Sequence, residues 1–172
     1  INKAYNYFKT RIVPDNCWIG TSIENRSAIH RLTKLKLIKS RIRFISFEPL
    51  LEDIGEVDLN GIQWTIVGGE SDFANPRPFD VAWARNIRDQ CRKSNTAFFY
   101  KQSGGKKKIN TIWGSNILDG RTYLEMPVAL STKESTTINT HSKGGSVKPT
   151  VDNSGVKSWL MNLSVGVIRS IT

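Results

Sequence analysis

The chain has 172 residues, 38% of them hydrophobic, which is enough to bury the core of one domain of ordinary size and excludes a protein that is disordered throughout. No run of residues approaches the roughly 20 apolar positions that a membrane helix needs, so a membrane-spanning protein is excluded as well. The 25 Lys and Arg residues outnumber the 15 Asp and Glu residues, and the net charge of +10 is compatible with contact with polyanions such as nucleic acid.

The beginning of the chain carries no recognisable export signal. It starts at Ile1 rather than Met, and we interpret it as a piece of a longer cytoplasmic chain. Its two cysteines, Cys17 and Cys91, have no second Cys or His at the spacing of metal sites. We therefore expect two buried, reduced thiols and no metal site in this chain.

One structural unit repeats from Cys17 to Lys101: a short β-rich apolar run, a polar turn and a segment of helical periodicity. Because strands alternate with helices and are apolar along their length, the sequence predicts an α/β fold, a partial βα-barrel in which about four parallel strands are covered by helices. The predicted strands are Cys17–Ile23, Arg43–Phe47, Gln63–Val67 and Ala97–Tyr100, and the predicted helices are Arg26–Lys39 and Asp80–Lys93.

Turn and capping residues support these boundaries. Glu24-Asn25 precedes the first predicted helix, and Pro78 with Asp80 precedes the second. The stretch from Pro49 to Ile62 is short, acidic and interrupted by glycine, so it is predicted to be a loop with at most one helical turn.

The composition changes after Pro127, where Ser, Thr, Gly, Asn and Lys predominate. We therefore divide the chain into a partial βα-barrel domain, residues 1–127, and a low-complexity tail, residues 128–172, that is expected to be largely disordered through about Lys157. The end of the tail, from Trp159 to Ile168, is apolar again. It is a docking strand or helix, or a stretch with no native structure, and the sequence does not choose between them.

Polar side chains follow each predicted strand at its carboxyl end. Ligands bind at this edge of barrels and of open parallel sheets, because the loops that follow the strands gather there. The residues that we interpret as binding a cofactor or substrate are Glu24, Asn25, Ser46, Glu48, Gly68, Gly69, Glu70, Ser71, Lys101 and Gln102. None of them is assigned a catalytic role.

The three carboxylates of this set need partners, because a carboxylate that follows an apolar strand is costly to bury alone. Lys101 is one candidate partner. In the functional interpretation the carboxylates bind a cationic or hydroxyl-rich ligand or act as acid or base. In the alternative, Glu48 caps the next turn and Lys101 neutralises a neighbouring Glu, with no ligand at all.

Two glycine pairs stand out near the strand ends. Gly68-Gly69 is a tight turn whose missing Cβ atoms allow close approach of a ligand or of another backbone segment. Gly104-Gly105 precedes three lysines, but this run lacks the spacing and the terminal Ser or Thr of a phosphate-binding P-loop, and we interpret it as a solvated turn.

Several blocks in order resemble one family, the uncharacterised phage proteins named after gene products thirty-seven and sixty-eight. The resemblance runs from about Cys17 to Pro127 and therefore covers the C-terminal half of such a protein only. Its blocks are Cys17–Asn25, Arg43–Leu51, Trp64–Ser71, Arg77-Pro78, Trp83–Cys91, Phe98–Gln102, Leu118–Thr122 and Met126-Pro127.

That family is similar to radical SAM enzymes, with a three-cysteine motif near the N-terminus that is expected to hold a four-iron four-sulfur cluster. The resemblance implies S-adenosylmethionine and this cluster as cofactors of the complete protein, neither of them bound by the present chain alone. It also implies that the missing N-terminal segment of the same protein is a partner, and that the ten strand-end residues line the mouth of a barrel.

Three functions stay open from the sequence. The first is the C-terminal part of a radical-SAM-like enzyme of unknown substrate, inactive by itself. The second is a basic nucleic-acid-binding module without catalysis. The third is an inactive truncated fragment, because four βα units cannot close an eight-stranded barrel and would leave an open sheet with exposed edges.

Overall fold

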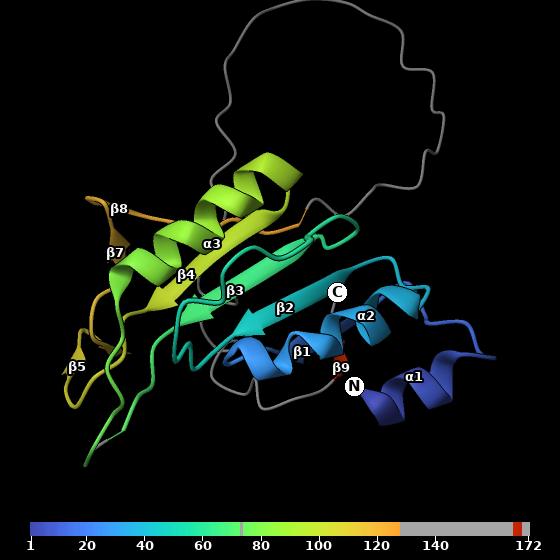
Figure 1. The fold of residues 1–172 in the computed structure, drawn as a ribbon, viewed down its shortest axis with the longest axis horizontal. Helices are drawn as coiled ribbons and strands as arrows, with labels where there is room; N and C mark the ends of the chain where they lie inside the picture. The colour runs from blue at the N-terminus through green and yellow to red at the C-terminus, as the bar shows by residue number, and fades with distance from the viewer. Residues whose placement is uncertain (73, 128–166, 170–172) are drawn as a thin grey trace, which may run out of the picture. The chain divides into compact units, whose positions relative to one another are not determined.

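The computed structural model describes residues 1–72 and 74–127 and the backbone of a short strand at 167–169 (Figure 1). The disorder expected through Lys157 therefore concerns residues outside this description, as does most of the apolar end. Within the described residues, none of the helices has the length and apolar character required to cross a membrane.

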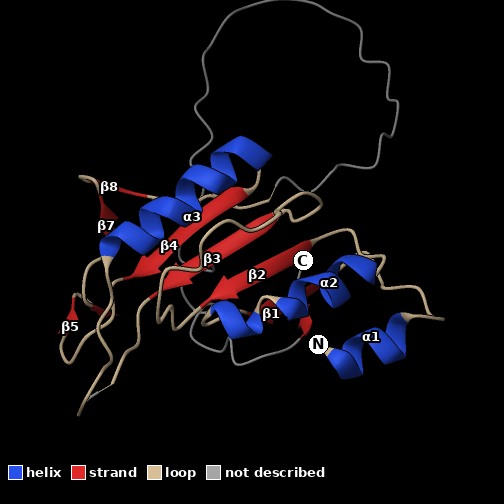
Figure 2. Ribbon diagram, in the orientation of Figure 1, coloured by secondary structure: helices blue, strands red, loops and turns tan. Residues whose placement is uncertain are grey.

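Four parallel strands form the centre of the fold, in the order β4-β3-β2-β1 (Figure 2). This arrangement confirms the predicted α/β class and the parallel sheet. The strands are β1 (Cys17–Ser22), β2 (Arg43–Phe47), β3 (Trp64–Gly68) and β4 (Ala97–Gln102). Residues 49–62, predicted to be a loop, contain no helix or strand.

The sheet is open, as predicted, but short segments pair with part of each outer parallel strand. On one side, strand β9 (Val167–Arg169) pairs antiparallel with β1, with Cys17 opposite Arg169. On the other side, the backbone after residue 122 pairs with β4: the Tyr100 amide donates to the Tyr123 carbonyl at 2.9 Å, and the Glu125 amide donates to Phe98 at 3.3 Å. These segments were not predicted, because the prediction counted only the βα units and not the short segments that add to an edge.

Two helices cover one face of the sheet (Figure 1), α2 (His30–Leu37) and α3 (Val81–Ser94). The Asp80 side chain caps α3 as predicted, accepting a hydrogen bond from the Ala82 amide at 2.8 Å. Asn25, predicted to cap or turn the chain before the other helix, is the N-cap of a single 3-10 turn, Arg26–Ala28, and makes no side-chain cap bond. A further helix, α1 (Asn2–Phe8), was not predicted and has no buried residue.

Side chains of each strand alternate between two apolar layers. The layer under the helices includes Ile19, Ile45, Val67 and Phe98, which are buried together with helix residues such as Leu35. The opposite face carries an aromatic cluster in which the Trp64 ring makes an edge contact with Trp18 and Phe99 and a tilted contact with Phe44. Because both faces are apolar, the strands read as continuous hydrophobic runs, as parallel sheets do.

Two short hairpins follow β4. The first joins β5 (Lys108–Ile109) to β6 (Ile112–Trp113), and the second joins β7 (Ile117–Leu118) to β8 (Arg121–Thr122). The turn of the second hairpin is Asp119-Gly120, both with positive φ, which is the geometry that the Asp-Gly pair favours between antiparallel strands.

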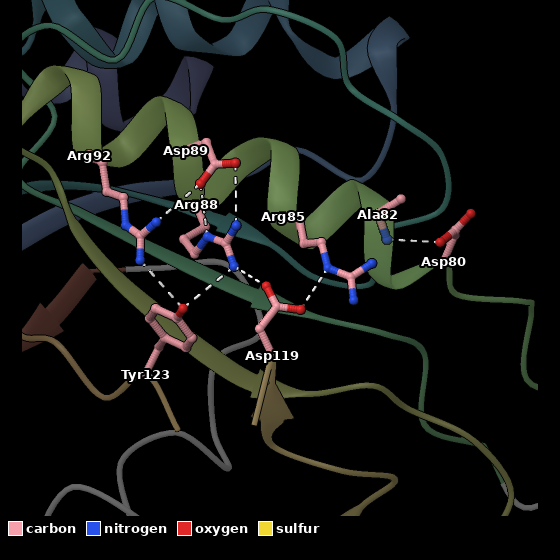
Figure 3. A network of polar contacts seen from close by, with 8 residues as sticks. All are labelled: Asp80, Ala82, Arg85, Arg88, Asp89, Arg92, Asp119 and Tyr123. Carbon is pink, nitrogen blue, oxygen red and sulfur yellow. Dashed lines mark hydrogen bonds and ion pairs between the residues drawn. The ribbon is translucent and has the colours of Figure 1, made fainter. Parts of the chain in front are cut away.

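An arginine network joins the second hairpin to α3 (Figure 3). The Arg88 side chain, only 10% exposed, forms ion pairs with Asp89 at 2.9 Å and with Asp119. Arg85 also pairs with Asp119, at 2.8 Å, and the Arg88 and Arg92 side chains both reach the Tyr123 hydroxyl. The network therefore holds the last part of the domain against the helix.

Candidate functional site

The carboxyl ends of the four parallel strands meet at one edge of the sheet, since neighbouring strands run in the same direction and in register. All ten residues that the sequence singled out lie in or directly after these ends. Their side chains do not form one cluster. The structure divides the charged members into three separate ion pairs.

The pair that crosses the centre of this edge is formed by Glu48 and Lys101. Lys101 lies in β4 and donates to the Glu48 carboxylate, which follows β2, over a distance of 2.6 Å. The two side chains are 25% and 16% exposed, respectively, so both charges are largely shielded from water. This contact unites two of the predicted residues.

Gly68, at the end of β3, makes room for that pair, because β3 lies between β2 and β4. A Cβ atom at this position would lie 3.3 Å from the Glu48 carboxyl carbon, which is tighter than most contacts of this kind. The glycine thus serves the close approach of Glu48 across the intervening strand.

Glu24 has its own partner close by in the sequence. Arg31 of α2 donates to the Glu24 carboxylate at 2.9 Å and to the Ser22 carbonyl at 2.8 Å. The Glu24 side chain is 27% exposed and the Arg31 side chain 37%. This pair ties the end of β1 to the following helix and does not contact Glu48 or Lys101 in any hydrogen bond of the described residues.

Glu70 is bound by Arg77 through two side-chain contacts and one backbone contact. The Arg77 Nε atom donates to Glu70 at 2.9 Å, the Arg77 amide donates to the same oxygen at 2.8 Å, and a terminal guanidinium nitrogen contacts the other oxygen. Hydrogen bonds from the Arg77 side chain and then from its amide lower the pKa of Glu70 to about 2.

This lowered pKa predicts an acid dependence of stability that depends on Glu70. A carboxyl whose pKa is depressed in the folded state stabilises it above its ordinary pKa of 4.5, and the contribution disappears as the pH falls through about 2. We expect the difference in unfolding free energy between the protein and Glu70→Gln to shrink steadily over this range. Urea unfolding at a series of pH values measures it, and a constant difference would contradict the assignment.

The Gly69 turn is filled by the protein itself. A Cβ atom on Gly69 would overlap with the Ser103 carbonyl, so the residue serves close packing against the chain after β4. Gln102 completes the contact by donating to the Gly69 carbonyl at 3.0 Å and to the Ser71 hydroxyl at 2.9 Å. The remaining Gln102 oxygen, Oε1, is buried and accepts no hydrogen bond from the described residues.

Two predicted residues take no part in these contacts. Ser46 is buried, and its carbonyl accepts a hydrogen bond from the Ile23 amide at 2.9 Å as part of the strand ladder. The Asn25 side chain accepts a hydrogen bond from the Ser27 hydroxyl at 2.6 Å, at the start of the 3-10 turn. Both therefore have local structural partners.

Residues 1–127 match a family described as "Protein of unknown function (DUF5131)". The chain belongs to this family. No curated protein and no solved structure matches the chain. The matched segment contains all four parallel strands and all ten strand-end residues, whereas β9 lies outside it.

The sequence did not identify the arginines that neutralise two of the carboxylates in the matched segment. Arg31 follows Glu24 by seven residues, and Arg77 follows Glu70 by the same interval. This repeated spacing is a signal that sequence reading could have used. Each arginine lies in the loop or helix that follows its strand and contacts the carboxylate at the strand end. The βα topology favours this contact, because it places that loop or helix next to the strand end.

The described residues do not fit an iron–sulfur cluster. No group of three or more His, Cys, Asp or Glu side chains among them is placed to hold a metal ion. Cys17 begins β1 at the edge opposite to the site, and Cys91 is buried in α3. Burial raises the pKa of the Cys91 thiol to about 12, partly offset by a hydrogen bond with Thr65, which opposes the thiolate form that cluster ligation requires.

A shallow depression of about 300 Å³ lies elsewhere, where the loop before β3 meets the end of α3. Its lining includes Asp58, which pairs with Lys36 at 2.6 Å, and Gln90, which bonds to the Val57 amide at 2.8 Å. This hollow is at the amino ends of the strands. The strand-end charges are therefore the better candidate site, because the ligands of parallel sheets bind at the carboxyl ends.

Proposed function

We propose that the chain is the C-terminal part of a radical-SAM-like protein of the phage gene-product family, and that Glu48 and Lys101 hold S-adenosylmethionine or the substrate in the complete protein. The parallel topology supports this proposal, because it brings both residues to the edge at which such sheets bind ligands.

The observation that carries the proposal is the ion pair between Glu48 and Lys101. A shielded ion pair adds little net stability, since loss of hydration offsets the attraction between the charges. Fold stability therefore gives no strong reason for placing two opposite charges across β3. A ligand that carries both an ammonium and a carboxylate would separate the pair. Glu48 would then bind the ligand's ammonium and Lys101 its carboxylate.

The amino-acid end of S-adenosylmethionine has these two groups, so the residues present fit it. Glu48 would bind the ammonium, Lys101 would bind the carboxylate, and the buried Gln102 Oε1 offers an unused acceptor in the same strand as Lys101. The cofactor supplies radical chemistry when it is cleaved reductively at a cluster. Because the described residues do not fit that cluster, its ligands are proposed to come from an upstream segment of the same protein.

The test uses the chain joined to the sequence that naturally precedes Ile1, reconstituted with iron and sulfide without oxygen. We expect reductive cleavage of S-adenosylmethionine, and Glu48→Gln and Lys101→Met each to weaken its binding by about tenfold or more, because each removes a charged hydrogen bond. Equilibrium dialysis with labelled S-adenosylmethionine measures binding, and the amount of cleaved nucleoside measures the reaction.

Lys36→Met is the matched control, since the Lys36–Asp58 pair has the same 2.6 Å separation and a similarly shielded lysine at the opposite edge of the sheet. It should leave binding and cleavage unchanged. A cluster-loaded protein that never cleaves S-adenosylmethionine would remove the radical-SAM assignment. Equal losses in Lys36→Met and Lys101→Met would remove the strand-end site.

We also propose a cytoplasmic location. Cys17 and Cys91 are both free and buried, which suits a reducing compartment.

A further inference from the structure

The β5–β6 hairpin stands beside the strand-end edge and is firmly attached to it. The Gly105 amide donates to the Glu70 carbonyl at 2.8 Å, and the Ser103 amide donates to the Ser115 carbonyl at 2.8 Å. The Ser115 amide returns a bond to the Ser103 hydroxyl at 2.9 Å. The base of the hairpin is thus hydrogen-bonded to the ends of β3 and β4, so its tip projects from a fixed position.

Glycine makes this attachment possible. A Cβ atom on Gly104 would overlap with the Glu70 carbonyl, and one on Gly114 would overlap with Gly104. The tip itself turns at Asn110-Thr111, both with positive φ, as in a two-residue hairpin turn. The backbone of the hairpin is therefore defined from its base to its tip.

Three consecutive lysines, Lys106, Lys107 and Lys108, are exposed on this hairpin. None of them forms an ion pair with a carboxylate in residues 1–72 and 74–127, and the nearby Glu70 is taken by Arg77. Other exposed lysines without an ion pair there, such as Lys3, occur singly. Clustering three like charges costs folding free energy, so the cluster is better explained by a polyanionic partner.

An aromatic ring lies beside these charges. Trp113 faces Lys108 across the hairpin, and the Lys108 Nζ atom lies 5.5 Å from the centroid of the Trp113 ring. Trp113 is only partly buried, and Ile109 near the tip is 52% exposed. An ammonium group beside a partly buried ring, with two more exposed lysines directly before it in the chain, is a combination that binds phosphates and stacks an unpaired base.

From this geometry we infer that the β5–β6 hairpin, residues 106–113, is a contact surface for single-stranded nucleic acid. The lysines would contact successive phosphates, and Trp113 would stack against a base. Single strands are favoured over duplexes because only unpaired bases present a free face to the ring. This inference does not depend on the proposed function, since none of the hairpin residues belongs to the Glu48–Lys101 pair.

The test measures binding of a fluorescein-labelled 12-nucleotide thymidine strand to the full chain by anisotropy at two salt concentrations. We expect binding at low salt that weakens steeply with added salt. Replacing Lys106, Lys107 and Lys108 together by Gln should weaken binding at least tenfold and make the salt dependence shallower by about 2 in the log–log slope, as loss of about three phosphate contacts requires. Trp113→Ala should weaken binding about tenfold and leave the slope of the salt dependence unchanged.

The matched control replaces Lys3, Lys39 and Lys93 by Gln, which removes the same charge from exposed positions away from the hairpin. It should change affinity by less than about threefold if a local surface rather than net charge is responsible. The inference is overturned if the two triple variants lose affinity equally, if no strand binds at low salt, or if duplex DNA or anionic phospholipid vesicles bind more tightly than the single strand. Circular dichroism and thermal unfolding of each variant establish that it is folded.

Discussion

Replacing Gly104 by Ala is expected to destabilise the protein by about 2 to 4 kcal/mol, because the substitution combines two separate costs. The residue has a φ of +74°, a conformation that residues with a Cβ atom adopt at a cost. The added methyl group would also overlap with the Glu70 carbonyl, a backbone atom that cannot move aside cheaply. Urea unfolding followed by circular dichroism measures the loss.

Gly55→Ala separates the two costs. Gly55 has the same φ of +74°, but nothing lies within 4 Å of the position that its Cβ atom would take. The Gly55→Ala variant should therefore lose about 1 to 2 kcal/mol of unfolding free energy, the cost of the backbone conformation alone. If the two variants were equally stable, the close packing of the Gly104 backbone against Glu70 would be absent in solution, and the hairpin would not be fixed to the strand ends.

Arg88→Met is the second substitution with a large expected effect, a loss of about 2 kcal/mol. The Arg88 guanidinium is held by Asp89 and Asp119 (Figure 3), and hydrogen bonds to Asp89, followed by those to Asp119 and Tyr123, raise its pKa above the ordinary value. Without this side chain, the polar contacts that remain from α3 to this part of the chain are the Arg85 ion pair with Asp119 and the Arg92 contact with the Tyr123 hydroxyl. Hydrogen exchange should show faster opening of residues 117–125.

Arg92→Met on the same helix provides the control. Arg92 also contacts Asp89 and the Tyr123 hydroxyl, but its side chain is 55% exposed. An exposed ion pair contributes little, so this variant should lose no more than about 0.5 kcal/mol. Equal losses in the two variants would show that burial of Arg88 does not determine the strength of the network.

The parallel sheet was predictable because its strands carry strong local signals. The bounds predicted for β2 equal those observed, and β3 differs by a single residue at each end. The end of β4 was placed two residues too early, since Lys101 and Gln102 are polar and their strand geometry depends on pairing with the distant Gly69. Tertiary pairing of that kind leaves no trace in local periodicity.

The hairpins were missed for a different reason. Their strands have two residues each, too few to show an alternating pattern. Asp119-Gly120 is a strong hairpin signal and could have predicted the second one. The turn of the first, Asn110-Thr111, contains a β-branched residue at a φ of +72°, which no propensity would suggest.

At the candidate site, the edge at which the charged residues lie was predictable from the sequence, and the ion pairs that they form were not. Parallel strands place Glu24, Glu48, Glu70 and Lys101 at one edge, and this followed from the order of elements. Which carboxylate meets the lysine depends on side-chain direction across β3, where Gly68 leaves space for Glu48. Gly68-Gly69 was predicted to allow close approach of a ligand or of another backbone segment; Gly69 packs against the Ser103 backbone, and Gly68 leaves space for the Glu48 carboxylate.

The pairing of both outer strands also bears on how copies of the protein behave together. With β9 against β1 and residues 123–125 against β4, neither flank of the sheet offers a full row of free amide and carbonyl groups. Two copies therefore cannot join their sheets side by side without first displacing one of these segments. Self-association at high concentration should accordingly use other surfaces and leave the amide protection of β1 and β4 unchanged.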